Sequence, residues 1–171
     1  MATTGAPPKR ATTKRAAPKA TGGARKRKPL DAGRLLSMSQ KQLDELFSSS
    51  TPGRTPEGVA SGTVIAAPGT PAARALAPLL GLAWRGKVFY ASEQDLLNRI
   101  LPIGLRAVRA TVYTEKSWFD GKKAIILDYS KSSLLARSIR DEIREVAPGL
   151  YLGIVYLRKT KTINFALSFP E

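Results

Sequence analysis

The sequence predicts a mainly β protein: one antiparallel barrel, closed or nearly closed, preceded by a short helix and a disordered basic N-terminal tail. Three observations support this class. Seven or eight strand-like runs follow residue 58, most of them joined by short segments rich in Gly, Pro and Asp. One short amphipathic pattern precedes them, and residues 2–29 contain no large apolar side chain. We therefore place the tail at residues 1–37 and a single barrel domain at 38–171.

The tail holds a large share of the positive charge. The chain has 28 Lys and Arg against 13 Asp and Glu, and nine of the basic residues lie in residues 1–28, where there is no acid. A segment this poor in apolar side chains cannot bury enough surface to offset its ordering entropy. Its charge predicts non-specific binding to polyanions such as nucleic acid, with a solubilising tail or attraction to an anionic membrane as alternatives. The predicted polyanion-binding residues are Lys9, Arg10, Lys14, Arg15, Lys19, Arg25, Lys26, Arg27 and Lys28.

Composition excludes several chemistries. The chain has no cysteine and no histidine, which rules out disulfides, thiolate nucleophiles, His- or Cys-based zinc sites, proximal-His haem and Ser-His-Asp triads within it. No phosphate loop or dinucleotide fingerprint is present, and we expect no cofactor and no metal. No apolar run approaches a bilayer-spanning length of about 20 residues, and the N-terminus lacks the apolar stretch of a secretory signal. We expect a soluble, cytoplasmic protein that is not transmembrane.

The first elements follow from capping and alternation. Ser39 and Gln42 fit a capping box, which predicts a short helix over 39–48 with its apolar stripe buried against the barrel. A Gly-rich strand is predicted over 58–67, and a second helix from Thr70, with Pro71 at its first position. Residues 84–90 form the next strand, where Gly86 allows a bulge or a close backbone approach.

The later strands are joined by recognisable turns. Residues 95–101 fit either a strand or a helix, whereas 105–115 alternate clearly and pair through Asp120-Gly121 with 123–129. Residues 139–146 also fit both patterns, but the turn Pro148-Gly149 before a clear strand at 150–158 favours a hairpin over a helix. A last strand is predicted over 162–169. The inward face of each strand stays open, since a one-residue shift inverts it.

Charged residues concentrate in the strand predicted at 139–146. In a barrel, Arg140, Glu142 and Arg144 would share one face and Asp141 the other, and an inward Arg–carboxylate set could hold a polar or acidic ligand head. An outward structural ion-pair ladder is the alternative. Acid–base catalysis by Asp141 or Glu142 is a further alternative, which requires burial to raise a carboxyl pKa.

Aromatic side chains supply the remaining candidates. Strand tyrosines can hydrogen-bond a ligand head while aliphatic neighbours take its tail, although they more often serve as packing. Asn98, Arg106 and Arg109 are weaker candidates for inward polar groups. Val64, Trp84, Phe89, Ile125, Leu127 and Ile154 would supply apolar walls or packing. The predicted ligand-binding residues are Trp84, Tyr113, Tyr129, Arg140, Glu142, Arg144 and Tyr151.

Two resemblances rest on these motifs. The stretch 43–169, with LDELF, W-R-G-K-V-F, DY, RDEIREVAPGLYLG and a closing FAL, resembles a family of uncharacterised bacterial domains common in actinobacteria. More distantly it is similar to GXWXG-type domains, which implies a lipocalin-like, or calycin-like, barrel. The chain departs from that pattern at Gly62-Thr63-Val64. It also lacks the histidine with which nitrobindin-like barrels bind haem. The resemblance implies a barrel and no established activity.

These observations leave three hypotheses for function. The first is a non-enzymatic barrel that binds a small apolar or amphipathic molecule with a polar or acidic head, while the tail binds polyanions, because a barrel of about eight strands can hold one small ligand. The second is a small enzyme that uses Asp141 or Glu142 in the same cavity. The third is a structural or interaction module whose barrel is filled by side chains.

Overall fold

The computed structural model describes residues 1–2, 29–72, 84–100, 106–132 and 136–170. Within these ranges the chain forms eight strands, two α-helices and a 3₁₀ turn. The helices are α1 (Ala32–Leu36) and α2 (Gln40–Ser49), and the turn is η1 (Ala91–Glu93). The strands are β1 (Gly58–Ile65), β2 (Trp84–Tyr90), β3 (Asp95–Ile100), β4 (Arg106–Lys116), β5 (Lys123–Asp128), β6 (Ile139–Ala147), β7 (Leu150–Leu157) and β8 (Thr160–Ser168).

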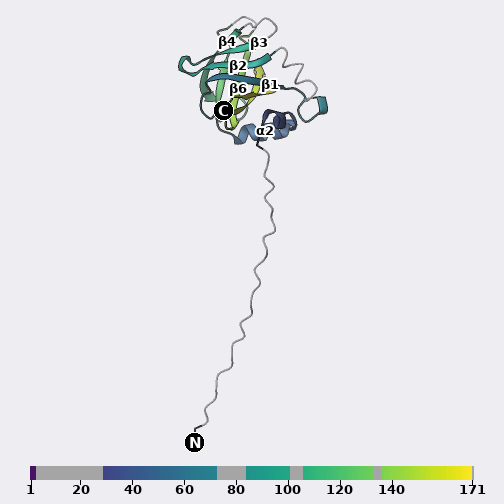
Figure 1. The fold of residues 1–171 in the computed structure, drawn as a ribbon, viewed down its shortest axis with the longest axis vertical. Coiled ribbons are helices and arrows are strands. Elements are labelled where there is room, and N and C mark those ends of the chain that lie inside the picture. Colours follow the sequence, from purple (N-terminus) through teal and green to yellow (C-terminus); the bar gives the residue numbers. More distant parts are fainter. Residues whose placement is uncertain (3–28, 73–83, 101–105, 133–135, 171) are drawn as a thin grey trace.

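The strands close into one antiparallel barrel. Each strand pairs with the next in sequence, and β1 pairs with β8, with Val64 opposite Phe165. Closure pairs both edges of the sheet, so none of these strands presents a continuous unpaired edge to solvent. Figure 1 shows the closed barrel with α2 on its outside. The predicted fold class is therefore confirmed. No helix among the described residues is long and apolar enough to cross a membrane.

Both ambiguous segments are strands. β6 forms a hairpin with β7 across Pro148-Gly149, with Arg140 opposite Tyr156, and its other edge pairs with β5. β3 likewise pairs on both sides, with β2 and β4. In each case ladder hydrogen bonds on two edges decide between two patterns that the short sequence fits equally well.

The helix predicted over 39–48 is α2. The Ser39 side chain accepts from the Gln42 backbone N–H and the Gln42 side chain accepts from the Ser39 N–H, which completes the capping box. Leu43 and Phe47 are fully buried on its inner face. The helix predicted from Thr70 lies largely outside the described residues.

The predicted boundary at residue 37 needs a correction, because α1 lies within the segment that was assigned to the tail. Asp31 caps this helix through its carboxylate, and Leu35 is completely buried with the side chains that cover the outside of the barrel. A helix of five residues is too short to show periodicity, so its stability comes from tertiary burial rather than from its own sequence. The basic residues predicted to bind polyanions, 9–28, lie outside the described part of the chain.

Both faces of part of the barrel wall are buried. Alternate side chains point inward and form one apolar cluster, which includes Phe89, Ile125 and Ile143. Ile126 and Ile154 face outward into a second cluster, which includes Leu35 of α1 and Phe47 of α2. The wall over β5–β8 is thus covered inside by core and outside by α1 and α2. This arrangement explains the continuous apolar run in β5.

Gly86 is required where β1 and β2 approach each other. Its φ is +124°, a β-bulge interrupts the pairing of β2 with β3 beside it, and a Cβ at this position would lie 2.1 Å from the carbonyl oxygen of Ala60. Only glycine accommodates that backbone and that contact. The bulge or close approach predicted at Gly86 is confirmed.

Candidate ligand-binding cavity

The barrel encloses a cavity of about 300 Å³. Apolar side chains from six strands or their connections form most of its wall, and four polar side chains lie at its inner end. Inward side chains that do not line the cavity, such as Phe89, Leu96 and Leu167, pack against one another and fill the remainder of the barrel. The apolar wall includes Val64, Trp84, Val108, Ile139, Val155 and Phe165. The barrel is therefore hollow in one part and filled in another.

The polar end is a connected cluster from β2, β3, β6 and the residue that follows β5. Lys87 of β2 donates from Nζ to Asn98 Oδ1 (2.8 Å), Tyr129 Oη (2.5 Å) and Asp141 Oδ2 (2.9 Å). Tyr129 donates to the same Asp141 oxygen at 3.0 Å. Asn98 donates to Tyr129 Oη and to the backbone oxygen of Val108, and accepts from Trp84 Nε1. All four polar residues are buried, with exposures of 2–6%.

Burial governs the electrostatics of this cluster. Desolvation lowers the pKa of Lys87, and the negative charge and hydrogen bond of Asp141 oppose that shift. Desolvation, followed by the charge of Asp141, raises the pKa of Tyr129 well above its ordinary value of 10.0. The rings of Trp84, Tyr129 and Phe165 lie 5.2–5.4 Å from the Lys87 nitrogen and add cation–π stabilisation.

One atom of the cluster is unsatisfied. Two buried side-chain oxygens have no hydrogen-bond partner among the described residues, Asp141 Oδ1 and Tyr156 Oη. Tyr156 belongs to the outer cluster beneath the helices, whereas Asp141 lines the cavity. A buried acceptor without a donor is costly, so Asp141 Oδ1 is the point where the cavity can offer a hydrogen bond.

Three predicted ligand-binding residues lie on the other side of the wall. Arg140, Glu142 and Arg144 face outward from β6, toward α2 and the β4–β5 turn, and they do not line the cavity. Glu142 is completely buried and accepts from Ser117 Oγ, from the Trp118 backbone N–H (2.8 Å) and from Arg140 Nε (3.1 Å). The inward face of β6 is the one that carries Asp141 and Ile143, because the register of the closed barrel sets it.

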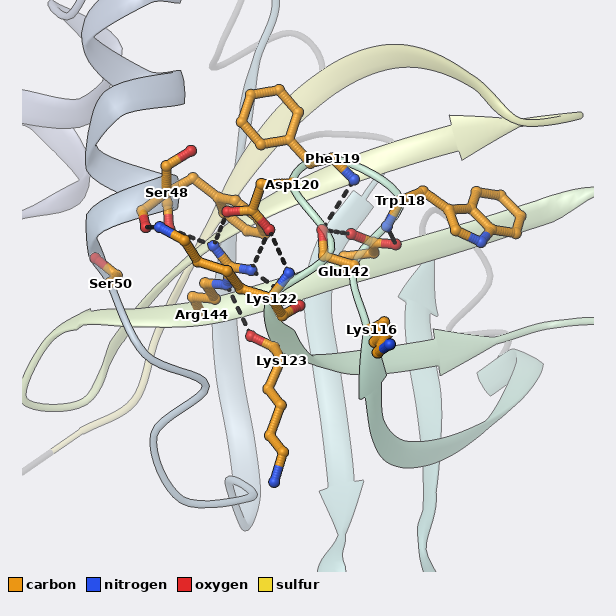
Figure 2. Close-up of polar contacts among 12 residues, drawn as sticks. Ser48, Ser50, Lys116, Trp118, Phe119, Asp120, Lys122, Lys123, Glu142 and Arg144 are labelled. Atoms are coloured by element: carbon orange, nitrogen blue, oxygen red, sulfur yellow. Dashed lines mark hydrogen bonds and ion pairs between the residues drawn. The ribbon is translucent and has the colours of Figure 1, made fainter.

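Arg144 fastens α2 and the β4–β5 turn to the barrel. Its guanidinium donates to both carboxylate oxygens of Asp120 at 2.7 Å and to the backbone oxygen of Phe47 at 2.8 Å, and its Cζ lies 4.4 Å from the Phe47 ring. Figure 2 shows this guanidinium turned toward Asp120, with Glu142 beside Trp118 on the same side of the strand. Arg140, Glu142 and Arg144 therefore have a structural role, because their hydrogen bonds join separate segments of the chain.

The two remaining tyrosines also lie away from the cavity. Tyr151 faces the interior but packs in the filled part, where its hydroxyl donates to the backbone oxygen of Arg54 at 2.8 Å. Tyr113 packs with the outer cluster and donates to Asp128. Of the seven predicted ligand-binding residues, the structure thus brings Trp84 and Tyr129 together at the cavity.

Sequence reasoning missed Lys87 and ranked Asn98 low. A signal for Lys87 existed, since it shares a strand face with the core residue Phe89, and a lysine on an apolar face needs a buried partner.

Of the other weaker candidates, Arg109 is exposed and pairs with Asp95 at 2.6 Å, and the side chain of Arg106 lies outside the described part. Among the predicted walls, Val64 and Trp84 line the cavity, Phe89, Ile125 and Leu127 fill the interior, and Ile154 faces outward.

Fold and cavity together define a closed, up-and-down antiparallel barrel with a hollow, polar-ended interior. The chain is similar to a crystal structure of a protein from Thermomonospora curvata, with a TM-score of 0.53 and 20% identity over 79% of this chain and 90% of that chain. At that identity the likeness shows the fold alone. No protein-family model and no curated protein matches the chain, so the resemblance to the actinobacterial and GXWXG-type domains stays a prediction.

Proposed function

We propose that the barrel binds a small, largely apolar molecule whose polar head contacts the cluster around Lys87 and Asp141. The observation that carries this proposal is the cavity of about 300 Å³, with apolar walls and a buried polar end that contains one unpartnered oxygen. Ligand sites commonly combine an apolar lining with a few convergent polar groups, and their volumes start near this size.

The exposure of the lining residues supports a direction of entry. Trp84, Val108, Ile139 and Val155 are partly exposed, and Ile163 is 38% exposed, whereas the polar cluster is buried. A ligand would therefore enter with its polar head first and leave its apolar tail at the rim. An engineered cavity of about 150 Å³ holds benzene, which has six non-hydrogen atoms. Because this cavity has about twice that volume, it suits a ligand of about twelve non-hydrogen atoms.

The geometry favours binding over catalysis. An ammonium group has three protons, and each of those of Lys87 is directed at an oxygen of Asn98, Tyr129 or Asp141, so the amine has no lone pair available as a nucleophile. Glu142, a candidate acid, lies behind the barrel wall. Among the acids proposed for catalysis, this leaves Asp141 at the cavity. The two other titratable groups that line it among the described residues, Lys87 and Tyr129, are both hydrogen-bonded to Asp141 itself.

The test is native mass spectrometry of the full chain purified from the organism that produces it, followed by denaturing release. We expect a discrete adduct of one ligand per chain. Val155→Phe, which fills the cavity, should remove the adduct, and Val59→Phe should retain it, because Val59 is 48% exposed on β1. An adduct that survives Val155→Phe, or a wild-type chain that shows neither an adduct nor a thermal shift across a panel of lipids and metabolites, would contradict the proposal.

We propose a separate role for the tail, which is non-specific binding of polyanions. Its nine basic residues without an acid support this role, because neutralised phosphates release counterions irrespective of base sequence. The barrel would then bind the small molecule, and the tail would hold the protein on nucleic acid or another polyanion.

A further inference from the structure

The head group of the ligand can be inferred from the unpartnered atom in the cavity. Asp141 Oδ2 already accepts from Lys87 and Tyr129, whereas Oδ1 has no donor in the described part of the chain, and the Asp141 side chain is only 6% exposed. A carboxylate oxygen can only accept from a donor. The group that satisfies Oδ1 therefore carries an O–H or N–H.

The donors of the cluster cannot serve a ligand instead. Lys87 already donates to three oxygens, and Tyr129 donates its hydroxyl proton to Asp141. The side-chain amide of Asn98 donates to Tyr129 and to the Val108 backbone. A ligand that only accepts, such as an ether or a carboxylate, would have to break one of these bonds. A ligand with a donor adds a bond and breaks none.

The charge of the cluster selects among ligands with donors. Lys87 and Asp141 form a buried ion pair, whose two charges sum to zero. A carboxylate ligand would place a second negative charge beside Asp141, and an alkylammonium would place a second positive charge beside Lys87. Either would bury an uncompensated charge in an apolar cavity, which is strongly unfavourable.

We propose that the ligand is a neutral lipophilic alcohol, whose hydroxyl donates to Asp141 Oδ1 and whose hydrocarbon part lies against Val155 and Phe165. This inference rests on the binding function proposed above and narrows it to one head group. The sequence allows either a polar or an acidic ligand head, and this inference selects a polar, uncharged one.

Four probes of nearly equal size, tested on the full chain, examine the inference. 1-Decanol and 1-methoxynonane are isomers of eleven non-hydrogen atoms, about the size that the cavity suits, and only the alcohol has a donor. Decanoic acid and decylamine carry the two charges. At pH 7.5 titration calorimetry should give the alcohol about 10- to 100-fold tighter binding than the ether, the range for a hydrogen bond to a charged group, and both charged probes should bind more weakly than the alcohol.

Two variants locate the effect. Asp141→Asn should reduce the preference for 1-decanol over 1-methoxynonane to about threefold or less, because the amide is a weaker acceptor than a carboxylate. Val155→Ala should weaken both isomers equally, since it trims the apolar wall and leaves the polar end intact. If Asp141→Asn does not fold, the four probes on the wild-type chain decide the question.

The outcomes separate this inference from the proposed function. If none of the probes binds and no native adduct is found, the binding function fails. If the two isomers bind equally, the cavity is a binding site but the hydroxyl inference is overturned. Equal binding is the result expected where a water molecule already donates to Asp141 Oδ1. Tightest binding by the acid or the amine would also overturn it.

Discussion

Asp141 and Glu142 are adjacent on β6, yet their carboxylates lie on opposite sides of the barrel wall. Asp141 joins Lys87 at 2.9 Å inside the barrel, and Glu142 accepts from the Trp118 backbone outside it. Each is buried and each is paired, so one strand supplies both the polar end of the cavity and the attachment of the β4–β5 turn. The two roles can be separated by mutation.

The inner ion pair should show strong coupling. Lys87→Met removes the ammonium and leaves Asp141 buried without its counterion, which we expect to lower the free energy of unfolding by about 3–5 kcal/mol. The double variant Lys87→Met/Asp141→Asn removes both charges and should recover a substantial part of that loss. Urea unfolding of the four proteins in this cycle measures the coupling. Additive single effects would show that the two side chains do not act as a pair.

The outer attachment depends on Arg144. Arg144→Lys retains the charge but cannot make the bidentate bond to Asp120 and reach the Phe47 oxygen together, and Arg144 is completely buried. Because lysine keeps the charge but leaves buried oxygens without a donor, we expect the free energy of unfolding to fall by about 1–3 kcal/mol for each such oxygen, with ligand affinity unchanged.

Arg109→Lys is the matched control for Arg144→Lys, because Arg109 forms an exposed pair with Asp95 and should cost no more than about 1 kcal/mol. Equal effects of the two substitutions on urea unfolding would refute the structural role of Arg144.

Asp120 should make stability sensitive to acid. The hydrogen bonds from Arg144 lower the pKa of Asp120 below its ordinary value of 3.8. A lowered folded-state pKa gives stability that is complete above 3.8 and is lost as the pH falls through the folded value. Asp120→Asn should therefore be less stable than wild type at pH 7, and the gap should narrow below pH 3.8. Urea unfolding at pH 7, 4, 3 and 2 measures it, and a gap independent of pH would contradict the ionic contribution.

Tyr151 should have the opposite sensitivity, at alkaline pH. Burial, followed by the charge of Glu145, raises the pKa of Tyr151 to about 12. A raised folded-state pKa gives stability that is complete below 10 and is lost as the pH rises through about 12. Tyr151→Phe lacks the hydrogen bond to Arg54 and should be less stable by about 1 kcal/mol at pH 8. Its deficit should shrink between pH 10 and 12, and a deficit that grows there would contradict the prediction.

The tail should account for retention on polyanions. Removal of residues 1–28 should abolish salt-sensitive binding to DNA and leave affinity for the small ligand unchanged. The slope of log K against log salt for the full chain should be steep, up to about 0.9 per phosphate contact. A full-length variant with the nine basic residues replaced by Gln should behave like the truncated chain. Loss of ligand affinity in either variant would refute the division of roles.

The sequence determined the strands and their order. Alternation, Gly86 and the turn Pro148-Gly149 predicted a barrel with a short helix before it, because these signals act between neighbours along the chain. The sequence also predicted that Asp141 and Glu142, the two adjacent carboxylates of β6, lie on opposite faces of the strand. Local patterns reach this far because a strand has a period of two whatever surrounds it.

Tertiary structure decided which face points inward. Over β5, β7 and β8 the inner face is covered by core and the outer face by the cluster beneath α1 and α2, so both faces are largely apolar. On β6 both faces carry charge, with Asp141 inside and Arg140, Glu142 and Arg144 outside, so polarity along these strands does not show which face points inward. Closure of the barrel turned Asp141 toward Lys87, which lies 54 residues away, and turned Arg144 toward α2. The burial of Leu35 and the hollow part of the barrel have the same origin: they depend on what distant segments cover or leave unfilled, and no local pattern contains that.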